Sequence, residues 1–406
     1  MLFSPKAFYD KVNNNLLFPE NKRVVLYFLS FLIALHNTPA IFMNSNMIEQ
    51  FVGNKNVGYI FALSSILSLF ILIKIKGFLQ KIGNYKTFVT ALTVDFVCLG
   101  ITSLSLFFNN YYFGIIFITA YIIGHMARIA IVFSMDIFLE NHSTDSQTGG
   151  IRGKLLTAVN FSFIIGPLLA SFVVTDVSNA GIVYVWGMTL LIPIFFIARK
   201  NFRNYLDSKY EKNSIMATTL KVLWNRNIYN ICKTNFALSL FYSWMIIYTP
   251  IFLRNIGFDL GQISMIIGFA LIPFVLLQIP LGKIADEKYG EKEIMIIGFS
   301  IMAIATATMS FVSSQSIFVW ILILFMTRVG ASMVEVMNET YLFKKINDSN
   351  IDIISTYRSI EGIAYIIGPI LASILLIFVK IEFIFLILAF IVLNGIRYAL
   401  KIRDSR

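Results

Sequence analysis

The sequence predicts an all-α integral membrane protein of twelve transmembrane helices, arranged as two similar six-helix bundles. Three observations predict it: the chain is unusually apolar, its apolar residues fall into runs of membrane-spanning length, and its two halves repeat. Apolar residues make up 57% of the 406 residues and charged residues only 14%, against roughly 25% charged residues in soluble domains. We therefore expect most of the outer surface to face lipid.

Runs of about 20 apolar residues are long enough to cross roughly 30 Å of hydrocarbon. The predicted spans are 24–43, 57–79, 86–108, 111–134, 155–175, 181–198, 230–253, 262–281, 294–312, 317–337, 360–379 and 382–400. The segment before the first span is polar, and no small-residue cleavage site follows that span, so we expect an uncleaved span rather than a signal peptide. The even number of spans places both termini on one side of the membrane.

Lysine and arginine predict the orientation, because cytoplasmic loops are enriched in them. If both termini are cytoplasmic, the outer loops hold only Lys55, Arg254 and Lys380 of the 33 basic residues, and Arg128 and Arg328 lie inside spans. We therefore expect a multi-pass protein of the inner (plasma) membrane with cytoplasmic N- and C-termini. The net charge of +11 is explained by these basic loops, so we expect no nucleic-acid partner.

A polar linker divides the chain into two related halves. Residues 199–227 form the longest polar segment and separate a first bundle, 1–198, from a second, 228–406. Span five contains the sequence IIGPLLAS, and span eleven contains IIGPILAS, so that Gly166 and Pro167 match Gly368 and Pro369. A parallel repeat of six plus six spans is how one large class of secondary transporters is built.

The segment between spans eight and nine carries the most specific motif. It reads GKIADEKYGEK, beginning at Gly282 and including Asp286 and Gly290. This resembles the cytoplasmic loop motif of the major facilitator superfamily, which runs Gly-x-Leu-Ala-Asp, a basic residue, and then Gly followed by basic residues. The resemblance covers essentially the whole chain and implies a transporter whose halves rock about a central site. The copy in the first half, beginning at Gly77, is shorter and lacks the aspartate.

The resemblance also implies a role for the aspartate and for the Gly-Pro segments. Asp286 would dock near the start of span five, beside Arg152, where the helix dipole favours an anion. We expect this contact to hold the cytoplasmic side shut; the alternative is a solvated loop residue. A Gly-Pro motif in span five marks many antiporters of the family, but its occurrence in both halves also fits close helix packing.

Charged side chains inside the membrane cost roughly 2.5–3.5 kcal/mol each on insertion scales, so they usually face a cavity or a partner. Span ten carries Arg328 and Glu335 on one helical face, and span four carries His125 and Arg128. The resemblance implies that spans one, four, seven and ten line the central cavity. We therefore predict that the arginines bind an anionic group of the solute, and that Glu335 or a histidine carries a proton.

Structural ion pairs are the alternative explanation of these charges. Arg128 has two candidate partners, Asp95 and Asp136, and Arg328 has one, Glu335. A packed ion pair satisfies a buried charge as well as a substrate does.

Spans one and seven supply the remaining cavity candidates. Span one contributes His36, Asn37 and Asn44, of which His36 titrates near neutral pH but is equally explained as a packing residue. Span seven contributes Trp244 and Tyr248 on one face, which suit a flat or amphipathic solute or simply pack.

The predicted function is secondary active transport of a small organic solute by alternating access, coupled to protons, with antiport favoured. An uncoupled facilitator, or a non-transporting or lipid-handling protein on the same fold, is the alternative. The chain has no G-x-x-x-x-G-K-[ST] motif for ATP, and none of its three histidines lies in a recognisable catalytic arrangement, so we expect no enzyme. We expect a monomer with no cofactor or metal, whose partners are the solute, protons and the lipid bilayer.

Overall fold

The computed structural model describes residues 20–108, 111–140, 148–203, 225–277, 280–281, 284, 290–345 and 351–402. Within these residues, the regular structure is entirely helical, which confirms the predicted all-α fold. The first half contains α2 (Glu20–Ile41), α3 (Asn44–Val52), α4 (Asn54–Ile82), α5 (Asn84–Leu106), α6 (Tyr111–Glu140), α7 (Thr148–Ser171), the short η2 (Val177–Asn179) and α8 (Gly181–Phe202). The second half contains α10 (Arg226–Ile256), α11 (Leu260–Ala270), α12 (Pro273–Leu276), α14 (Glu291–Thr308), α15 (Ile317–Lys345), α16 (Ile351–Phe378) and α17 (Ile381–Ala399).

Each of the twelve predicted spans coincides with a helix or with a pair of helices. In the described part of the chain, nine helices are long and apolar enough to cross a membrane. Shorter apolar stretches, Thr157–Ser171 and Leu260–Leu276, belong to α7 and to α11 with α12. The helix α14 is not among these nine, and the charged residues in its first turn raise its polarity. Large apolar side chains cover the outer surface as well, for example Phe172, which is 81% exposed, as expected for a surface that faces lipid.

A proline lies near the end of one predicted span and inside another. The helix of span one, α2, ends at Ile41, shortly after Pro39, whose nitrogen has no proton for the helical hydrogen bond, and the separate helix α3 begins at Asn44, just beyond the predicted span. Span eight divides into α11 and α12, and Pro273 begins α12, the position at which proline fits a helix. The α4–α5 connection is a single residue, Gly83, whose φ of 82° favours glycine.

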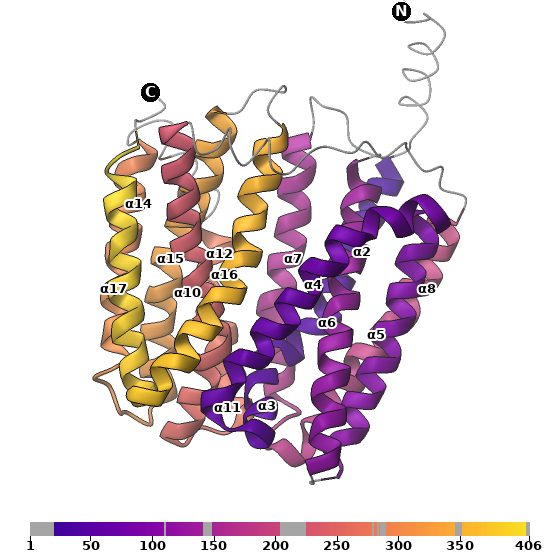
Figure 1. Cartoon of the computed structure of the whole chain (residues 1–406), viewed down its shortest axis with the longest axis horizontal. Helices are drawn as coiled ribbons and strands as arrows, with labels where there is room; N and C mark the ends of the chain where they lie inside the picture. The colour runs from indigo at the N-terminus through magenta and orange to yellow at the C-terminus, as the bar shows by residue number, and fades with distance from the viewer. Residues whose placement is uncertain are drawn as a thin grey trace, which may run out of the picture.

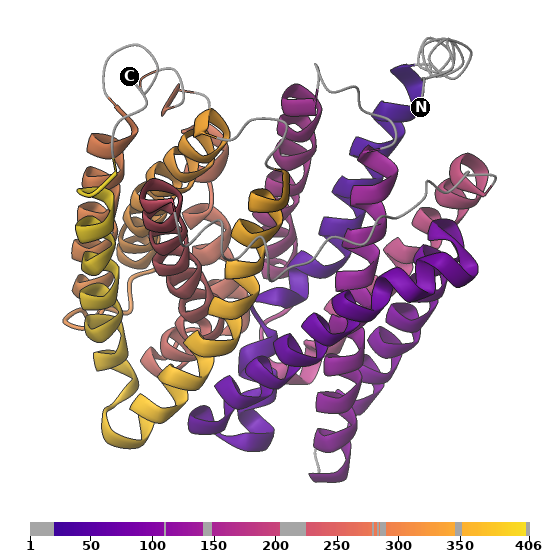
Figure 2. The ribbon, with the colours of Figure 1, turned by 45° about the horizontal axis from the view of Figure 1, so that its top comes forward.

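Helices α2 to α8 pack mainly on one another, and helices α10 to α17 do the same (Figure 1). The two groups remain distinct when the molecule is turned (Figure 2). Helix α2 begins and α17 ends at one end of the molecule, which we call the terminal end; α3 and the start of α11 lie at the opposite, distal end (Figure 1). The exact bundle boundaries at 198 and 228 stay a prediction, because residues 204–224 lie outside the described residues.

The bundles contact each other closely in the distal half. Helix α4 packs on α16, where Gly58 lies so near Pro369 and Tyr248 that a Cβ atom would collide with their oxygens. Helix α11 packs on α7, and a Cβ atom on Gly261 would lie 2.5 Å from the Val174 carbonyl oxygen.

Polar contacts join the bundles at the same end. The Leu260 backbone N–H donates to the Thr175 carbonyl oxygen across 3.2 Å. The Arg254 guanidinium lies 3.3 Å from the Asp176 carboxylate. The distal end is therefore closed in this conformation.

Candidate functional site

A buried polar cluster lies inside the first bundle, where α2, α5 and α6 meet. Asp95 of α5 is fully buried, and its Oδ1 accepts a hydrogen bond of 2.7 Å from Arg128 Nη1 of α6. Its Oδ2 lies 2.9 Å from Nε2 of His36, whose Nδ1 contacts the Ile33 carbonyl oxygen. Of the two partners proposed for Arg128, the structure therefore has Asp95, and the Arg128 charge is neutralised within the protein.

Arg328 occupies the matching position in α15 but has different surroundings. It is only 4% exposed, its Nη1 lies 3.4 Å from the Thr327 hydroxyl, and its guanidinium carbon lies 5.5 Å from the centre of the Phe241 ring. In the described part of the chain, Arg328 forms no ion pair with a carboxylate. The expected alternative, a pair with Glu335, is not formed, because the Glu335 Oε2 instead accepts a hydrogen bond of 2.6 Å from the Tyr242 hydroxyl.

The internal repeat explains why the two arginines differ. Gly83 directly precedes α5, and Gly290 directly precedes α14. Asp95 and Met302 lie the same number of residues after these two glycines, so they occupy matching positions in the two halves. Met302 packs against α15, since a Cβ atom on Gly330 would lie 2.6 Å from its backbone nitrogen. The position of Asp95, the acid that neutralises Arg128, is thus occupied by an apolar residue, Met302, in the second half.

The histidine of the cluster is replaced in the same way. Thr38 packs on Gly166 of α7, and Ser243 packs on Gly368 of α16 at the matching crossing. When these two crossings are aligned, His36 of the first half corresponds to Phe241 of the second half. The Phe241 ring is the one that lies next to the Arg328 guanidinium. The second half therefore keeps the arginine but replaces both of its polar neighbours by apolar ones.

A cavity of about 510 Å³ lies between the bundles, with α4 and α6 on one side and α16 on the other. Its polar lining comprises Ser65, Ser68, His125, Asp136, Ser359, Glu361 and Tyr365. His125, a predicted cavity residue, shares a hydrogen bond of 2.8 Å with Ser68. Tyr365, which lines this cavity, also interacts electrostatically with Arg328 and with Glu335.

Three predicted residues line a much smaller cavity inside the first bundle. Asn37, Asn44 and Arg128 surround about 10 Å³, together with Tyr121 and Tyr184. The Tyr184 hydroxyl donates to the Asn44 side-chain oxygen across 2.8 Å. This space is about the size of one water molecule and is too small for an organic solute.

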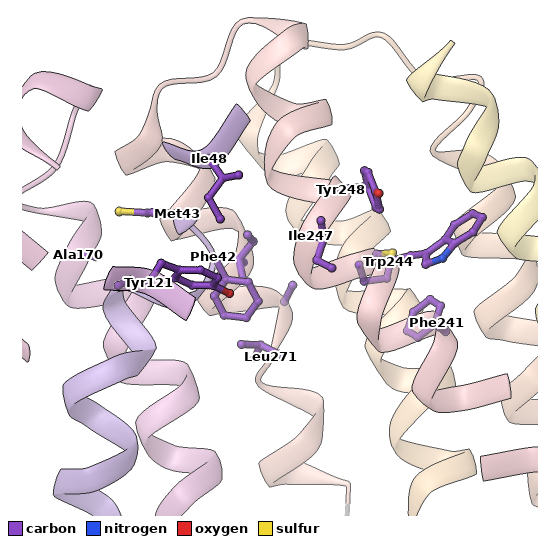
Figure 3. Close-up of a cluster of buried hydrophobic side chains, with 14 of the residues drawn as sticks. Phe42, Met43, Ile48, Tyr121, Ala170, Phe241, Trp244, Ile247, Tyr248 and Leu271 are labelled. Atoms are coloured by element: carbon purple, nitrogen blue, oxygen red, sulfur yellow. The ribbon is translucent and has the colours of Figure 1, made fainter. Parts of the chain in front are cut away.

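The aromatic face predicted on span seven packs against a neighbouring helix. Trp244 and Tyr248 are fully buried, and they extend from α10 away from Phe42 and Tyr121 (Figure 3). Trp244 Nε1 donates to the Gly368 carbonyl oxygen across 2.7 Å, and the Tyr248 hydroxyl donates to the Pro369 carbonyl oxygen across 3.1 Å. These bonds join α10 to the Gly-Pro segment of α16, which supports the packing interpretation of both features.

The remaining predicted motifs are described only in part. Gly282 and Asp286 of the loop motif lie outside the described residues, and Gly290 directly precedes α14. In the first half, Gly166 and Pro167 lie in α7, where the Thr38 hydroxyl donates to the Ser162 carbonyl oxygen across 3.0 Å. The role of Asp286 as a lock stays a prediction.

Sequence reasoning missed the contribution of α16 to the cavity. Glu361 stands at the edge of predicted span eleven, where a charged residue looks like part of a loop, and Tyr365 looks like one more aromatic residue in an apolar run. Their separation of four residues places both on one helical face, which is the signal that could have identified them.

Comparison with known proteins agrees with this architecture. The sequence model of the Major Facilitator Superfamily matches residues 24–350 and 236–404, which together span nearly the whole chain. The chain belongs to the major facilitator superfamily. No curated protein matches the sequence.

Solved structures of several superfamily transporters resemble this member. The nucleoside transporter NupG superposes with a TM-score of 0.70 at 12% identity, over 93% of this chain and 98% of its own. A bacterial homologue of the iron transporter ferroportin, in an inward-facing state, gives 0.68 at 10% identity, over 93% and 96%. A bacterial homologue of the lysosomal transporter Spinster, inward-facing and unoccupied, gives 0.63 at 10% identity, over 93% and 92%. At these identities, the likeness establishes the fold alone.

Proposed function

We propose that this transporter of the major facilitator superfamily carries a small organic anion, or a zwitterion, and that Arg328 binds the anionic group. The observation that carries the proposal is the absence of a carboxylate partner for Arg328 among the described residues, although the side chain is 96% buried. A buried cation is costly unless it is paired. An anionic substrate supplies the missing partner during part of the transport cycle.

The first-half arginine has a structural role in this proposal. Arg128 is paired with Asp95, so that it offers no net charge to a solute. The packing of Trp244 and Tyr248 against α16 argues against a solute that depends on aromatic stacking there. The substrate is therefore held mainly by the second bundle, at a single cationic anchor.

Glu335 couples the solute to a proton. Its Oε2 accepts a hydrogen bond from the Tyr242 hydroxyl, and Tyr242 also interacts electrostatically with Arg328. An ionised Glu335 repels an anion bound at Arg328, and protonation removes that repulsion. Proton and anion therefore favour each other's binding, and this linkage is reciprocal. Such cooperative binding favours symport for an anionic solute.

The antiport expected from the Gly-Pro motif has less support. Gly166 packs on Thr38 in the first half, and Gly368 packs on Ser243 in the second, so the motif has the same packing role in both halves. A feature that serves both bundles alike does not distinguish antiport from symport.

The terminal end is cytoplasmic in this proposal, as the basic loops predict. The distal end then faces outward and is closed by the α4–α16 and α7–α11 contacts. The conformation is consequently inward-facing, and the cavity of about 510 Å³ lies on the cytoplasmic route to Arg328. Alternating access opens the distal contacts and closes the terminal end.

Uptake into proteoliposomes tests the coupling. A radiolabelled anion that stabilises the purified protein is offered with an inward proton gradient, to the wild type and to Glu335→Gln. We expect uphill accumulation by the wild type, and only gradient-independent exchange by Glu335→Gln. The matched control is Glu293→Gln, the same substitution at an exposed position of α14, and it should behave like the wild type.

Two results would contradict the coupling. Accumulation preserved in both Glu335→Gln and His36→Ala would exclude proton coupling through these residues. A wild type that only equilibrates the anion, whatever the gradient, would be an uncoupled facilitator.

A further inference from the structure

Basic and tyrosine side chains gather at the terminal end of the second bundle, where α10 begins and α17 ends. The Lys233 ammonium of α10 lies 4.4 Å from the centre of the Tyr229 ring and 4.8 Å from the centre of the Tyr398 ring of α17. An ammonium over an aromatic face is held by the electrostatic attraction of the ring. The two rings therefore fix the position of Lys233 between the helices.

Two further basic residues share this surface. Arg226, Tyr229 and Lys233 follow one another at spacings of three and four residues, which places them on one face of α10. Lys401 follows Tyr398 by three residues, in the turn after α17. Arg226 and Lys401 are both exposed.

Buried apolar contacts hold the two helix ends together beneath these side chains. Ile228 and Ile231 of α10 belong to one buried cluster with Ala399 and Ile402, at the end of α17 and just beyond it. The arrangement of Arg226, Lys233 and Lys401 is thus fixed by the packing of the bundle.

Among the residues that the structure describes, this positive charge has no carboxylate partner. Within the described residues, none of Arg226, Lys233 and Lys401 forms an ion pair with a carboxylate. Within the same described part of the chain, Arg397 forms a hydrogen bond of 3.5 Å to Asn394 and no ion pair. With respect to the described residues, these basic side chains are therefore available to bind an anion.

The position of the surface identifies the kind of anion. Arg226 and Ala399 stand at the ends of two membrane spans, so the side chains lie at the depth of the lipid headgroups. Tyrosine is enriched at this depth, and basic pockets between transmembrane helices bind anionic headgroups. The half-buried Lys233 reaches from the apolar level of the bilayer toward the same zone.

We propose that Arg226, Lys233 and Lys401, with Tyr229 and Tyr398, form a binding site for the headgroup phosphate of an anionic phospholipid. The basic side chains contact the phosphate, and the acyl chains lie along α17, where the apolar side chains of Phe390, Leu393 and, at the end of the helix, Leu400 are exposed. This site is separate from the Arg328 region and does not depend on the transported solute.

Lipid-dependent thermal unfolding of the full-length protein tests the site. Detergent-solubilised protein is titrated with phosphatidylglycerol or with phosphatidylcholine, and retained lipid is measured in parallel by native mass spectrometry. The test variant is Lys233→Gln/Lys401→Gln. The matched control is Lys81→Gln/Lys86→Gln, which removes the same charge from exposed positions at the terminal end of the first bundle.

We expect phosphatidylglycerol, but not phosphatidylcholine, to raise the unfolding temperature of the wild type and of the control. Each removed charge should weaken phosphatidylglycerol binding about fivefold, and added salt should weaken binding to the wild type. Lys401→Gln alone, at an exposed position after α17, provides the same measurement if the double variant folds poorly. Inorganic phosphate at equal concentration should not reproduce the effect.

Three results would overturn the proposal. Equal stabilisation of the Lys233→Gln/Lys401→Gln variant and the wild type would exclude these lysines as ligands. A loss of stabilisation in the Lys81→Gln/Lys86→Gln control as well would indicate nonspecific dependence on net charge. Full stabilisation by inorganic phosphate would identify a site for the free ion instead of a lipid.

Discussion

Arg128 and Asp95 lie 2.7 Å apart inside the first bundle, and this ion pair is missing from the second, where Arg328 lies over Phe241. The same residue type at matching positions of a repeat thus has two environments. One arginine is paired with a carboxylate, and the other has no carboxylate partner among the described residues. Arg128 is therefore an internal control position for experiments that test whether Arg328 binds the solute.

The Arg128–Asp95 pair should contribute to stability as a unit. Asp95→Ala leaves the Arg128 cation buried without a carboxylate, so we expect a loss of about 3–5 kcal/mol. Arg128→Ala should cost a similar amount, and the double variant should recover a large part of the loss. Unfolding in detergent, followed for the two single variants and the double variant, measures this coupling; purely additive losses would show that the two residues act independently.

Gly58 should control the closure of the distal end. A Cβ atom at this position would collide with oxygens of Pro369 and Tyr248, so Gly58→Leu should push α4 away from α16 and favour the distal-open conformation. Gly77→Leu is the control. Gly77 lies in the same helix, and a Cβ atom added there would have no atom of a neighbouring helix or side chain within 4 Å.

Distances between spin labels report this shift. Labels at Lys55 and Lys380, two exposed positions at the distal end, should move apart in Gly58→Leu and stay at the wild-type distance in Gly77→Leu. The background should lack the two buried native cysteines, Cys98 and Cys232. An unchanged distance in Gly58→Leu would refute the assignment of α4 and α16 to the distal gate.

Trp244 should act through packing and not through the solute. Trp244→Phe keeps an aromatic ring but loses the hydrogen bond to the Gly368 carbonyl oxygen. Interhelical hydrogen bonds in membranes contribute about 0.6 kcal/mol on average, so we expect a small loss of stability with an unchanged KM for transport. A raised KM at unchanged stability would return Trp244 to the binding site.

Most of the fold could be predicted from the sequence, because the hydropathy of a span is a property of consecutive residues. The twelve predicted spans match helices. The short helix α3, which follows the predicted end of span one, was not predicted, since it depends on how these residues pack on neighbouring helices.

The site was harder to predict because its contacts join different helices. Both Asp95 and Asp136 were plausible partners of Arg128, and only the packing of α5 on α6 decides between them. Spacing within α15 placed Glu335 near Arg328, yet the carboxylate bonds Tyr242 of α10 instead. The partner that each charged side chain meets depends on the rotation of its helix about its own axis. An amphipathic pattern indicates this rotation poorly in a membrane protein, because the lipid-facing side of each helix is apolar as well.

The most direct test of the role of Arg328 is a thermal-stability screen of the purified protein against organic anions, amphipathic cations, sugars and amino acids. A bound ligand raises the unfolding temperature by mass action. We predict that an organic anion or zwitterion stabilises the wild type, that Arg328→Ala loses this stabilisation, and that the Arg328→Ala variant without ligand remains folded. Stabilisation by the same anion that persists in Arg328→Ala would contradict the proposal and would make Arg328 a structural residue.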